Sequence, residues 1–336
     1  MLKLRYLFDN RDLALMLLEN WDYDKNALDM LDYYRISANA IYPYKQNEKI
    51  FFLRFTPFDI KTEQEMIEEI KFIQYLKEKG LNVLEPVLSK DKNYLIKKYT
   101  PWGEYLACAF KKVSGDRLDG FNSDGIEYTD DLLINYGKTL GKLHKYSSQY
   151  KKVSKKSCFD LLEEMEYAWK NKFNNRNYRI TKEFTEIKEL LYKIPKNESN
   201  FGIIHGDYEL DNVFYDKSSK NIAIIDFGSS LYNWYIMDVE TSLENIKEEL
   251  SDKDFNKIKT LFINGYTEEY QYNEKELEFL PLLKRLNELC GYIELLISIE
   301  EVWDNEPLWL VELREKLNKN YIQKYEADIE KRAYCT

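Results

Sequence analysis

The segment that most constrains how this chain can fold reads FGIIHGDYELDNVFYDKSSKNIAIIDFGSS, residues 201–230. It holds three short strand-like runs, at 203–204, 213–215 and 222–225. Asp207 follows the first run, Asn212 directly precedes the second, and Asp226 follows the third. A polar turn, 216–221, joins the second and third runs, so we expect a hairpin between Asn212 and Asp226. That hairpin would place all three side chains at one edge.

These three residues suit phosphoryl transfer. Moving a phosphoryl group from a nucleotide to a hydroxyl requires a carboxylate beside the hydroxyl and oxygen ligands that hold magnesium against the phosphates. The pattern H-x-D-x-x-x-x-N starts at His205, one of only two histidines in the chain, so a chance match is rare. The alternative is an ordinary β-hairpin with surface acids.

The segments HGDYELDN and IDFGSS resemble the catalytic and metal-binding loops of the aminoglycoside phosphotransferase/choline kinase family. Its members are small-molecule kinases with a protein-kinase-like fold. The resemblance implies that Asp207 is the base for the acceptor hydroxyl and that Asn212 and Asp226 bind Mg²⁺. It also implies that His205 braces the loop, and that Asp238 supports it by hydrogen bonding.

The order of expected elements predicts an α+β, bilobal fold. Strands with one main helix occupy roughly residues 33–113, and mostly helical patterns begin near 130, so we expect a nucleotide-binding N-terminal lobe over 1–113 and a catalytic helical lobe over 114–336. The expected strands are 40–44, 49–55, 84–88, 93–98 and 104–113, and the expected helices are 62–79, 131–146, 159–171, 181–192, 242–250, 254–270, 275–299 and 309–328. Helical spacing is also present over 10–30.

Such kinases hold the nucleotide phosphates with a cation on a strand and position that cation with a helix carboxylate. In KIFFLRF, strand alternation places Arg54 on the face opposite Leu53, where the family carries Lys or Arg. Glu69 lies within the apolar stripe of the next helix and needs a partner, for which Arg54 is the first choice. Glu65 is the second candidate for this carboxylate. The alternatives are a surface arginine and an acid at the helix margin.

The remaining nucleotide contacts are less sharply marked. The expected phosphate-covering turn, RISANAI, contains no glycine, and its candidates are Ser37 and Asn39. The connection ACAFKKVSG resembles a kinase hinge, so backbone groups from Lys111 to Val113 would pair with a purine and Phe110 would close the back of the pocket. Ordinary strand core is an equal alternative for Phe110.

Three other features have plain interpretations. His144 is aligned with apolar residues of its helix, which is typical of a core histidine bonded to backbone. The lysines of segment 151–156 indicate a solvated loop. The acidic-aromatic stretch 300–304 is either a solvated turn or part of a pocket for a cationic acceptor.

Composition narrows the remaining classes. The net charge of −10 argues against general binding to nucleic acid or to an anionic membrane. No apolar run approaches the roughly 20 residues that span a bilayer, and the first residues lack signal-peptide features, so we expect a cytoplasmic protein. The four cysteines show no CxxC spacing, which indicates neither a disulfide framework nor a zinc site.

We therefore expect a kinase that uses ATP or GTP with Mg²⁺ to phosphorylate a hydroxyl of a small acceptor, such as an aminoglycoside-like antibiotic or an amino alcohol. The alternative is a kinase-fold protein with a structural or scaffolding role, like some spore-coat relatives. A protein kinase is disfavoured because no A-P-E-like segment follows Asp226. The sequence leaves the acceptor, the choice of nucleotide and the oligomeric state open.

Overall fold

The computed structural model describes residues 3–37, 39–119, 126–150, 155–250 and 254–332. The chain forms two compact units. The first, here called the sheet unit, comprises Asp9–Lys155 and Lys196–Lys275. The second, the helical unit, comprises Met1–Phe8, Lys156–Pro195 and Glu276–Thr336. This division leaves the lobe boundary expected at 113/114 as a prediction.

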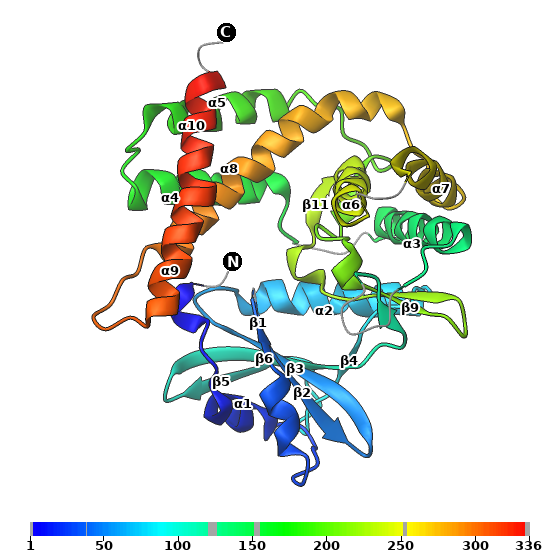
Figure 1. Ribbon diagram of the computed structural model, residues 1–336, viewed down its shortest axis with the longest axis vertical. Coiled ribbons are helices and arrows are strands. Elements are labelled where there is room, and N and C mark those ends of the chain that lie inside the picture. The colour runs from blue at the N-terminus through cyan, green and yellow to red at the C-terminus, as the bar shows by residue number, and fades with distance from the viewer. Residues whose placement is uncertain (1–2, 38, 120–125, 151–154, 251–253, 333–336) are drawn as a thin grey trace. The chain divides into compact units, whose positions relative to one another are not determined.

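An antiparallel sheet of six strands forms one part of the sheet unit (Figure 1). Its order is β1-β2-β3-β6-β4, and β5 pairs with the β6 strand. All five expected strands are present, and the one expected at 93–98 lies a little later. The bounds are β1 (Arg35–Ile36), β2 (Ala40–Gln46), β3 (Lys49–Pro57), β4 (Glu85–Val87), β5 (Ile96–Thr100) and β6 (Gly103–Lys111).

The two faces of this sheet are covered by different helices. Helix α1 (Arg11–Leu18) packs Leu13 and Leu17 against Leu53, which lies on one face of β3. Helix α2 (Glu63–Glu78) packs on the other face, where it shares a core with Phe110 of β6 (Figure 1). The pleat therefore places Arg54 on the α2 side, as the alternation predicted.

The rest of the sheet unit carries the loops of the candidate site. Strand β8 pairs with β11, and β9 pairs with both β10 and β7. Strand β8 lies beside α3 and α6, and α7 packs on α3. The bounds are β7 (Asp116–Arg117), α3 (Asp130–Gln149), β8 (Phe201–Ile204), β9 (Val213–Asp216), β10 (Asn221–Ile224), β11 (Leu231–Trp234), α6 (Tyr235–Glu249) and α7 (Phe255–Thr267).

One expected boundary in this region is wrong, and one strand was not expected. Helix α6 starts at Tyr235, seven residues before the expected start at 242. Its N-cap, Trp234, makes no side-chain capping bond, so the usual start signal is missing from the sequence. Strand β11 was not expected, because it is defined by its pairing with β8, between Leu231 and Ile204, rather than by a local pattern.

The helical unit contains α4 (Cys158–Lys172), α5 (Tyr178–Leu191), α8 (Leu280–Ile299), α9 (Leu308–Leu317) and α10 (Gln323–Arg332). These agree with the expected helices, with two local differences. The segment Glu274–Phe279 forms a 3-10 turn before α8, and Asn318–Ile322 forms a π-helical turn between α9 and α10. Among the described residues, no helix has the length and apolar character needed to cross a membrane.

The helical spacing over 10–30 is only partly realised as helix. Helix α1 ends at Leu18, and the segment Leu28–Tyr33 forms a 3-10 turn. Between them the buried Trp21 donates its indole N–H to the carbonyl of Val87 at 3.2 Å. This contact with the sheet replaces further helix.

Helices α3 and α7 approach backbone to backbone. A Cβ added at Gly137 would lie 1.9 Å from the carbonyl oxygen of Phe262, and one at Gly265 would lie 1.9 Å from that of Ile134. We predict that Gly137→Ala lowers the free energy of unfolding by about 1–3 kcal/mol, because the helices must separate. The measurement is the urea midpoint.

The control for this prediction is Gly291→Ala, since a Cβ at Gly291 would meet nothing within 4 Å. On helix α8 this change should stabilise the protein slightly, by up to about 1 kcal/mol. Equal midpoints for Gly137→Ala and the wild type would contradict the close helix contact.

Candidate active site

The loop that carries Asp207 leaves strand β8 through a turn that only glycine fits. Gly206 has φ of 81°, and a Cβ there would lie 2.4 Å from the carbonyl oxygen of Ser229. Asn212 closes this loop: its Nδ2 donates to the Asp207 carbonyl oxygen at 3.0 Å and to Asp207 Oδ2 at 2.9 Å. The amide oxygen of Asn212 has no hydrogen bond within the described part of the chain.

The hairpin of β9 and β10 brings Asp226 to the same place. Ile225 donates its N–H to the Asn212 carbonyl oxygen at 3.0 Å, directly before Asp226. Asp226 itself has the left-handed backbone conformation, with φ of 58°, and its Oδ1 accepts from Gly228 N at 3.3 Å. The structure therefore brings together the three residues that the sequence predicted at one edge.

The electrostatics of this cluster follow from its acids. Burial raises the pKa of Asp207, and the negative charges of Asp226 and Asp211 act in the same direction, while His205 opposes them. A cation placed between Asp207 and Asp226 would relieve that repulsion.

Asp238 fixes the backbone that leads into Asp207. Its carboxylate is buried and accepts from His205 N at 2.6 Å and from Gly206 N at 2.8 Å. The ring Nε2 of His205 lies 2.9 Å from the Ile225 carbonyl oxygen, next to Asp226. These are the contacts expected of residues that support the loop.

His144 is a core histidine, as expected, but its partners are side chains rather than backbone. Its Nε2 lies 3.1 Å from Asp238 Oδ2 and its Nδ1 lies 2.8 Å from the Tyr266 hydroxyl. Burial lowers the pKa of His144, although Asp238 acts in the opposite direction. Sequence reasoning missed this link to the site, because the partners come together only in the fold.

A reciprocal tyrosine pair holds the loop against α3. Tyr136 donates its hydroxyl to the Tyr208 carbonyl oxygen, and Tyr208 donates to that of Tyr136, both at 3.0 Å. The rings are stacked with centroids 4.8 Å apart. Tyr208 follows Asp207 directly, so this pair restricts the backbone at that residue.

Arg54 and Glu69 form a buried ion pair, as the sequence predicted. Arg54 Nη1 lies 2.6 Å from Glu69 Oε1, and both side chains are almost inaccessible to solvent. Burial alone would raise the pKa of Glu69, but Arg54 and Lys61 outweigh it and lower the pKa to about 2. Glu65, the second candidate, instead completes the capping box of α2 with Thr62.

Lys61 is a second cation at this site that sequence reasoning missed. Its Nζ lies 3.4 Å from Glu69 Oε2 and donates to the Gly228 carbonyl oxygen at 2.9 Å. A Cβ at Gly228 would lie 3.5 Å from Lys61 Nζ and 3.7 Å from Asn39 Nδ2. No local motif marks a lysine in the connection between a strand and a helix.

The two expected phosphate-loop residues differ in their surroundings. Asn39 is buried beside Gly228, and its Oδ1 has no hydrogen-bond partner among the described residues. Ser37 is exposed, and its backbone N–H already donates to the Asn39 carbonyl oxygen at 3.0 Å. Of the two Ser37 donors, only the hydroxyl therefore remains as a candidate contact for phosphate.

The expected hinge lies at the end of β6. Phe110 is buried in the core, and the guanidinium of Arg54 lies 5.0 Å above its ring. Lys111 is exposed and pairs with Glu85, while Val113 packs on the same core. Phe110 therefore belongs to the core and contacts the cation of the site.

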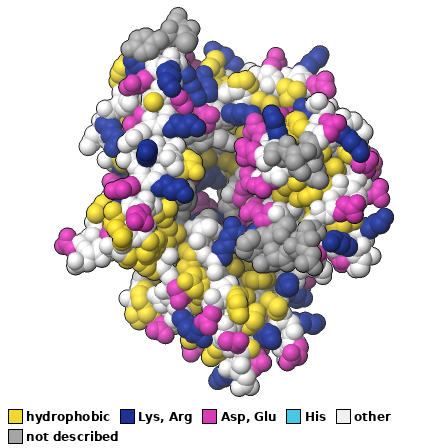
Figure 2. Space-filling model, viewed as in Figure 1, with side chains coloured by type: hydrophobic (Ala, Val, Ile, Leu, Met, Phe, Trp, Pro, Cys, Tyr) yellow, Lys and Arg dark blue, Asp and Glu magenta, His cyan; other side chains and the backbone are white. Residues whose placement is uncertain are grey.

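Several acids lie near the loop that carries Asp207. Burial, together with Asp207, Asp211, Glu248 and Glu249, raises the pKa of Glu209 from 4.5 to about 7. Figure 2 shows acidic side chains gathered on the face that carries α6. This part of the protein favours a positively charged ligand group.

The lysine-rich segment 151–156 differs from the solvated loop that the sequence indicates. Within the lysine-rich segment, 151–154 lie outside the described residues, and Lys155 is not a solvated-loop lysine. Its Nζ donates to Ser230 Oγ at 2.6 Å, and burial lowers its pKa to about 8.

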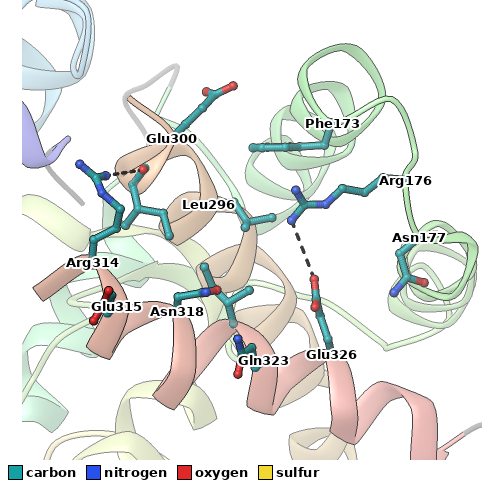
Figure 3. Close-up of a pocket in the computed structure, with 12 residues that line it drawn as sticks. Phe173, Arg176, Asn177, Leu296, Glu300, Arg314, Glu315, Asn318, Gln323 and Glu326 are labelled. Atoms are coloured by element: carbon teal, nitrogen blue, oxygen red, sulfur yellow. Dashed lines mark hydrogen bonds and ion pairs between the residues drawn. The ribbon is translucent and has the colours of Figure 1, made fainter. Parts of the chain in front are cut away.

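The helical unit contains a separate pocket of about 770 Å³ (Figure 3). Its walls include Leu296 of α8, the π-helical turn and Glu326, which lies 3.8 Å from Arg176. From the acidic-aromatic stretch only Glu300 lines it, and that carboxylate pairs with Lys172 at 2.6 Å. None of the site residues expected from the sequence lines this pocket.

Comparison with known proteins identifies the family. The sequence model of the phosphotransferase enzyme family (APH) matches residues 42–279, so the chain belongs to this family of phosphotransferases. Amicoumacin kinase of Bacillus subtilis (strain 168) is 22% identical over 278 residues, which cover 79% of each chain. The expected resemblance and the expected phosphotransferase activity on small-molecule hydroxyls are thereby confirmed.

Solved structures show the same fold. The amicoumacin kinase hAmiN, in complex with AMP-PNP, Ca²⁺ and Ami, has a TM-score of 0.71 at 18% identity and covers 95% of this chain and 96% of its own. A microcompartment-associated aminopropanol kinase has a TM-score of 0.63 at 18% identity, covering 95% and 98%. Choline kinase LicA from Streptococcus pneumoniae has a TM-score of 0.57 at 12% identity and covers 87% of this chain and 89% of its own. The expected α+β, bilobal kinase-like fold is confirmed.

The raised pKa of Glu209 predicts a pH-dependent stability. Because the folded state holds the Glu209 proton up to about pH 7, the contribution of Glu209 to the free energy of unfolding falls as pH rises from 4.5 to about 7. Glu209→Gln removes this loss, so its melting temperature should exceed that of the wild type at pH 8 and equal it at pH 4. Thermal unfolding without metal or nucleotide measures this.

The control is Glu78→Gln, which changes an exposed carboxylate at the end of α2. It should follow the wild type at both pH values. If Glu209→Gln also did so, Glu209 would not be buried among negative charges.

Proposed function

We propose that this protein transfers the γ-phosphoryl group of ATP or GTP to a hydroxyl of a small, amine-bearing acceptor. Asp207 acts as the base, and Asn212 and Asp226 hold Mg²⁺. The observation that carries this proposal is the convergence of Asp207, Asn212 and Asp226 at the end of one hairpin. The buried Arg54–Glu69 pair is tied to the same loop through Lys61.

The nucleotide side of the site rests on Arg54. One of its nitrogens is used by Glu69, whereas Nε and Nη2 are buried without a hydrogen-bond partner among the described residues. Buried donors of this kind are costly unless a ligand accepts from them. Phosphate oxygens are suitable acceptors for a guanidinium, and Asn39 lies on the same side as a second contact. The purine lies against the backbone of 111–113.

The residues present fit a magnesium ion. Such an ion is commonly held by one or two protein oxygen ligands together with phosphate oxygens and water. The Asn212 amide uses its nitrogen for Asp207, which leaves its oxygen for the ion, and Asp226 supplies a carboxylate. When bound, the ion neutralises charge on the transferred phosphoryl group.

Asp207 handles the acceptor. Its carboxylate orients the acceptor hydroxyl and takes up its proton as the new oxygen–phosphorus bond forms. The bond from the γ-phosphorus to the bridging oxygen breaks, and a nucleoside diphosphate leaves. The hydrogen bond from Asn212 and the Tyr136–Tyr208 pair hold Asp207 in place, so the catalytic contribution is positioning.

The acids around the loop support an amine-bearing acceptor. Glu209 and Asp211 flank Asp207, and Glu248 and Glu249 lie close enough to raise the pKa of Glu209. An ammonium group on the acceptor would restore the balance of charge there. Kinases similar to this chain are named for amicoumacin and aminopropanol. Within the cell we expect the protein in the cytoplasm, where nucleoside triphosphates are available.

The role of Asp207 as the base predicts that its substitution reduces turnover but not nucleotide binding. Asp207→Asn keeps the shape and the contact with Asn212 but cannot accept a proton, so turnover should fall by about 10²–10⁴-fold. Binding of a fluorescent ATP analogue should change little. Nucleotide consumption is measured with amicoumacin A, 1-amino-2-propanol, spectinomycin and choline as acceptors.

The control is Asp216→Asn, an acid in the turn at the other end of the same hairpin. It should retain wild-type turnover. Wild-type rates in Asp207→Asn would exclude Asp207 as the base, and turnover with none of the four acceptors would contradict the amine-bearing acceptor.

The metal role predicts a different loss. Asp226→Asn should abolish the increase in melting temperature that ATP or GTP causes only when Mg²⁺ is present. The variant retains an oxygen but lacks the negative charge that favours a divalent ion. Differential scanning fluorimetry with and without Mg²⁺ tests this, and full metal-dependent stabilisation of the variant would remove Asp226 from the metal site.

A further inference from the structure

Glu69 is placed between two cations rather than one. Arg54 Nη1 donates to Glu69 Oε1 at 2.6 Å, and Lys61 Nζ donates to Glu69 Oε2 at 3.4 Å. The Glu69 carboxylate is buried, whereas 23% of the Lys61 side-chain surface is accessible to solvent. Arg54 and Lys61 therefore share the two oxygens of a single carboxylate.

Lys61 also reaches the loop of Asp226. Its Nζ donates to the Gly228 carbonyl oxygen at 2.9 Å, across a sequence separation of 167 residues. This carbonyl lies two residues after Asp226, whose left-handed backbone is unfavourable for a residue with a side chain. Such a conformation persists only when its surroundings hold it. The hydrogen bond from Lys61 is one such restraint.

We propose that Lys61 is a positioning residue for phosphoryl transfer: it ties the Asp226–Gly228 loop to helix α2 through Glu69, in the arrangement that receives the metal ion and phosphates. This rests on the proposed function, because it gives Asp226 the role of metal ligand. Lys61 acts through Asp226 and Glu69 and not as a base.

The arrangement has two physical consequences. Without Lys61, the Gly228 carbonyl oxygen loses its charged donor, so the loop samples more conformations and Asp226 is less often in place. The site would also lose one positive charge beside Glu69, which lowers its attraction for phosphate. Both effects weaken binding of the metal-nucleotide complex.

Hydrogen exchange on the metal-free protein is the first test. In Lys61→Met, the amides of Gly228 and Ser230, which bond to Asp226 Oδ1 and the Phe227 carbonyl, should exchange about tenfold faster or more. Lys71→Met is the matched control, because Lys71 pairs with buried Glu68 of the same helix at 3.0 Å. Exchange at the two amides should be unchanged in that control.

The variant Lys61→Gln distinguishes loss of the hydrogen bond to Gly228 from a general loss of folding. Glutamine can still donate to the Gly228 carbonyl oxygen, so exchange should fall between that of the wild type and of Lys61→Met. If Lys61→Met does not fold, Lys61→Gln is compared with Lys71→Met, and faster exchange at Gly228 is again expected. Wild-type exchange in the folded Lys61 variants would overturn the proposal.

Metal dependence is the second test. The Mg²⁺ concentration that gives half-maximal nucleotide consumption should rise about tenfold in Lys61→Met and stay unchanged in Lys71→Met, with turnover recovering at high Mg²⁺. An unchanged metal dependence in an active Lys61→Met would overturn the positioning role alone. If the wild type itself consumes no nucleotide, the proposed function fails, while the exchange experiment still decides whether Lys61 holds the loop.

Discussion

The buried carboxylate of Asp238 is the contact on which the geometry of the site depends. It accepts the backbone N–H groups of His205 and Gly206 and also lies 3.1 Å from His144 Nε2. A buried carboxylate with this many donors is stable only when they are all in place. The backbone that leads into Asp207 is therefore fixed by a side chain on α6, so the Asp207 loop is held against a helix.

The restraints on the two sides of the site are different in kind. The Asp207 loop is held by short contacts with α3 and α6, through Tyr136 and Asp238. The Asp226 loop is held by its hairpin and by Lys61. The buried pair of Arg54 and Glu69 joins β3 to α2, and Lys61 connects Glu69 to this second loop. Acids therefore cluster around the Asp207 loop, whereas buried guanidinium nitrogens of Arg54 have no hydrogen-bond partner among the described residues.

Local signals in the sequence predicted much of this arrangement. The alternation around Arg54 and the stripe that contains Glu69 are each readable within one strand or helix, and the spacing of Asp207, Asn212 and Asp226 is readable within one short segment. What could not be predicted depends on contacts between distant segments. Lys61 and Gly228 are 167 residues apart, His144 and Asp238 are 94 apart, and β11 exists only through its pairing with β8. No local pattern encodes such partners.

The most direct test is a crystal structure with AMP-PNP and Mn²⁺, in which anomalous scattering locates the metal. The account predicts a manganese ion bound by the amide oxygen of Asn212 and the carboxylate of Asp226, with phosphate oxygens on Arg54 and the Asp207 carboxylate open towards the acceptor. An ion held elsewhere, or phosphates that do not contact Arg54, would contradict it.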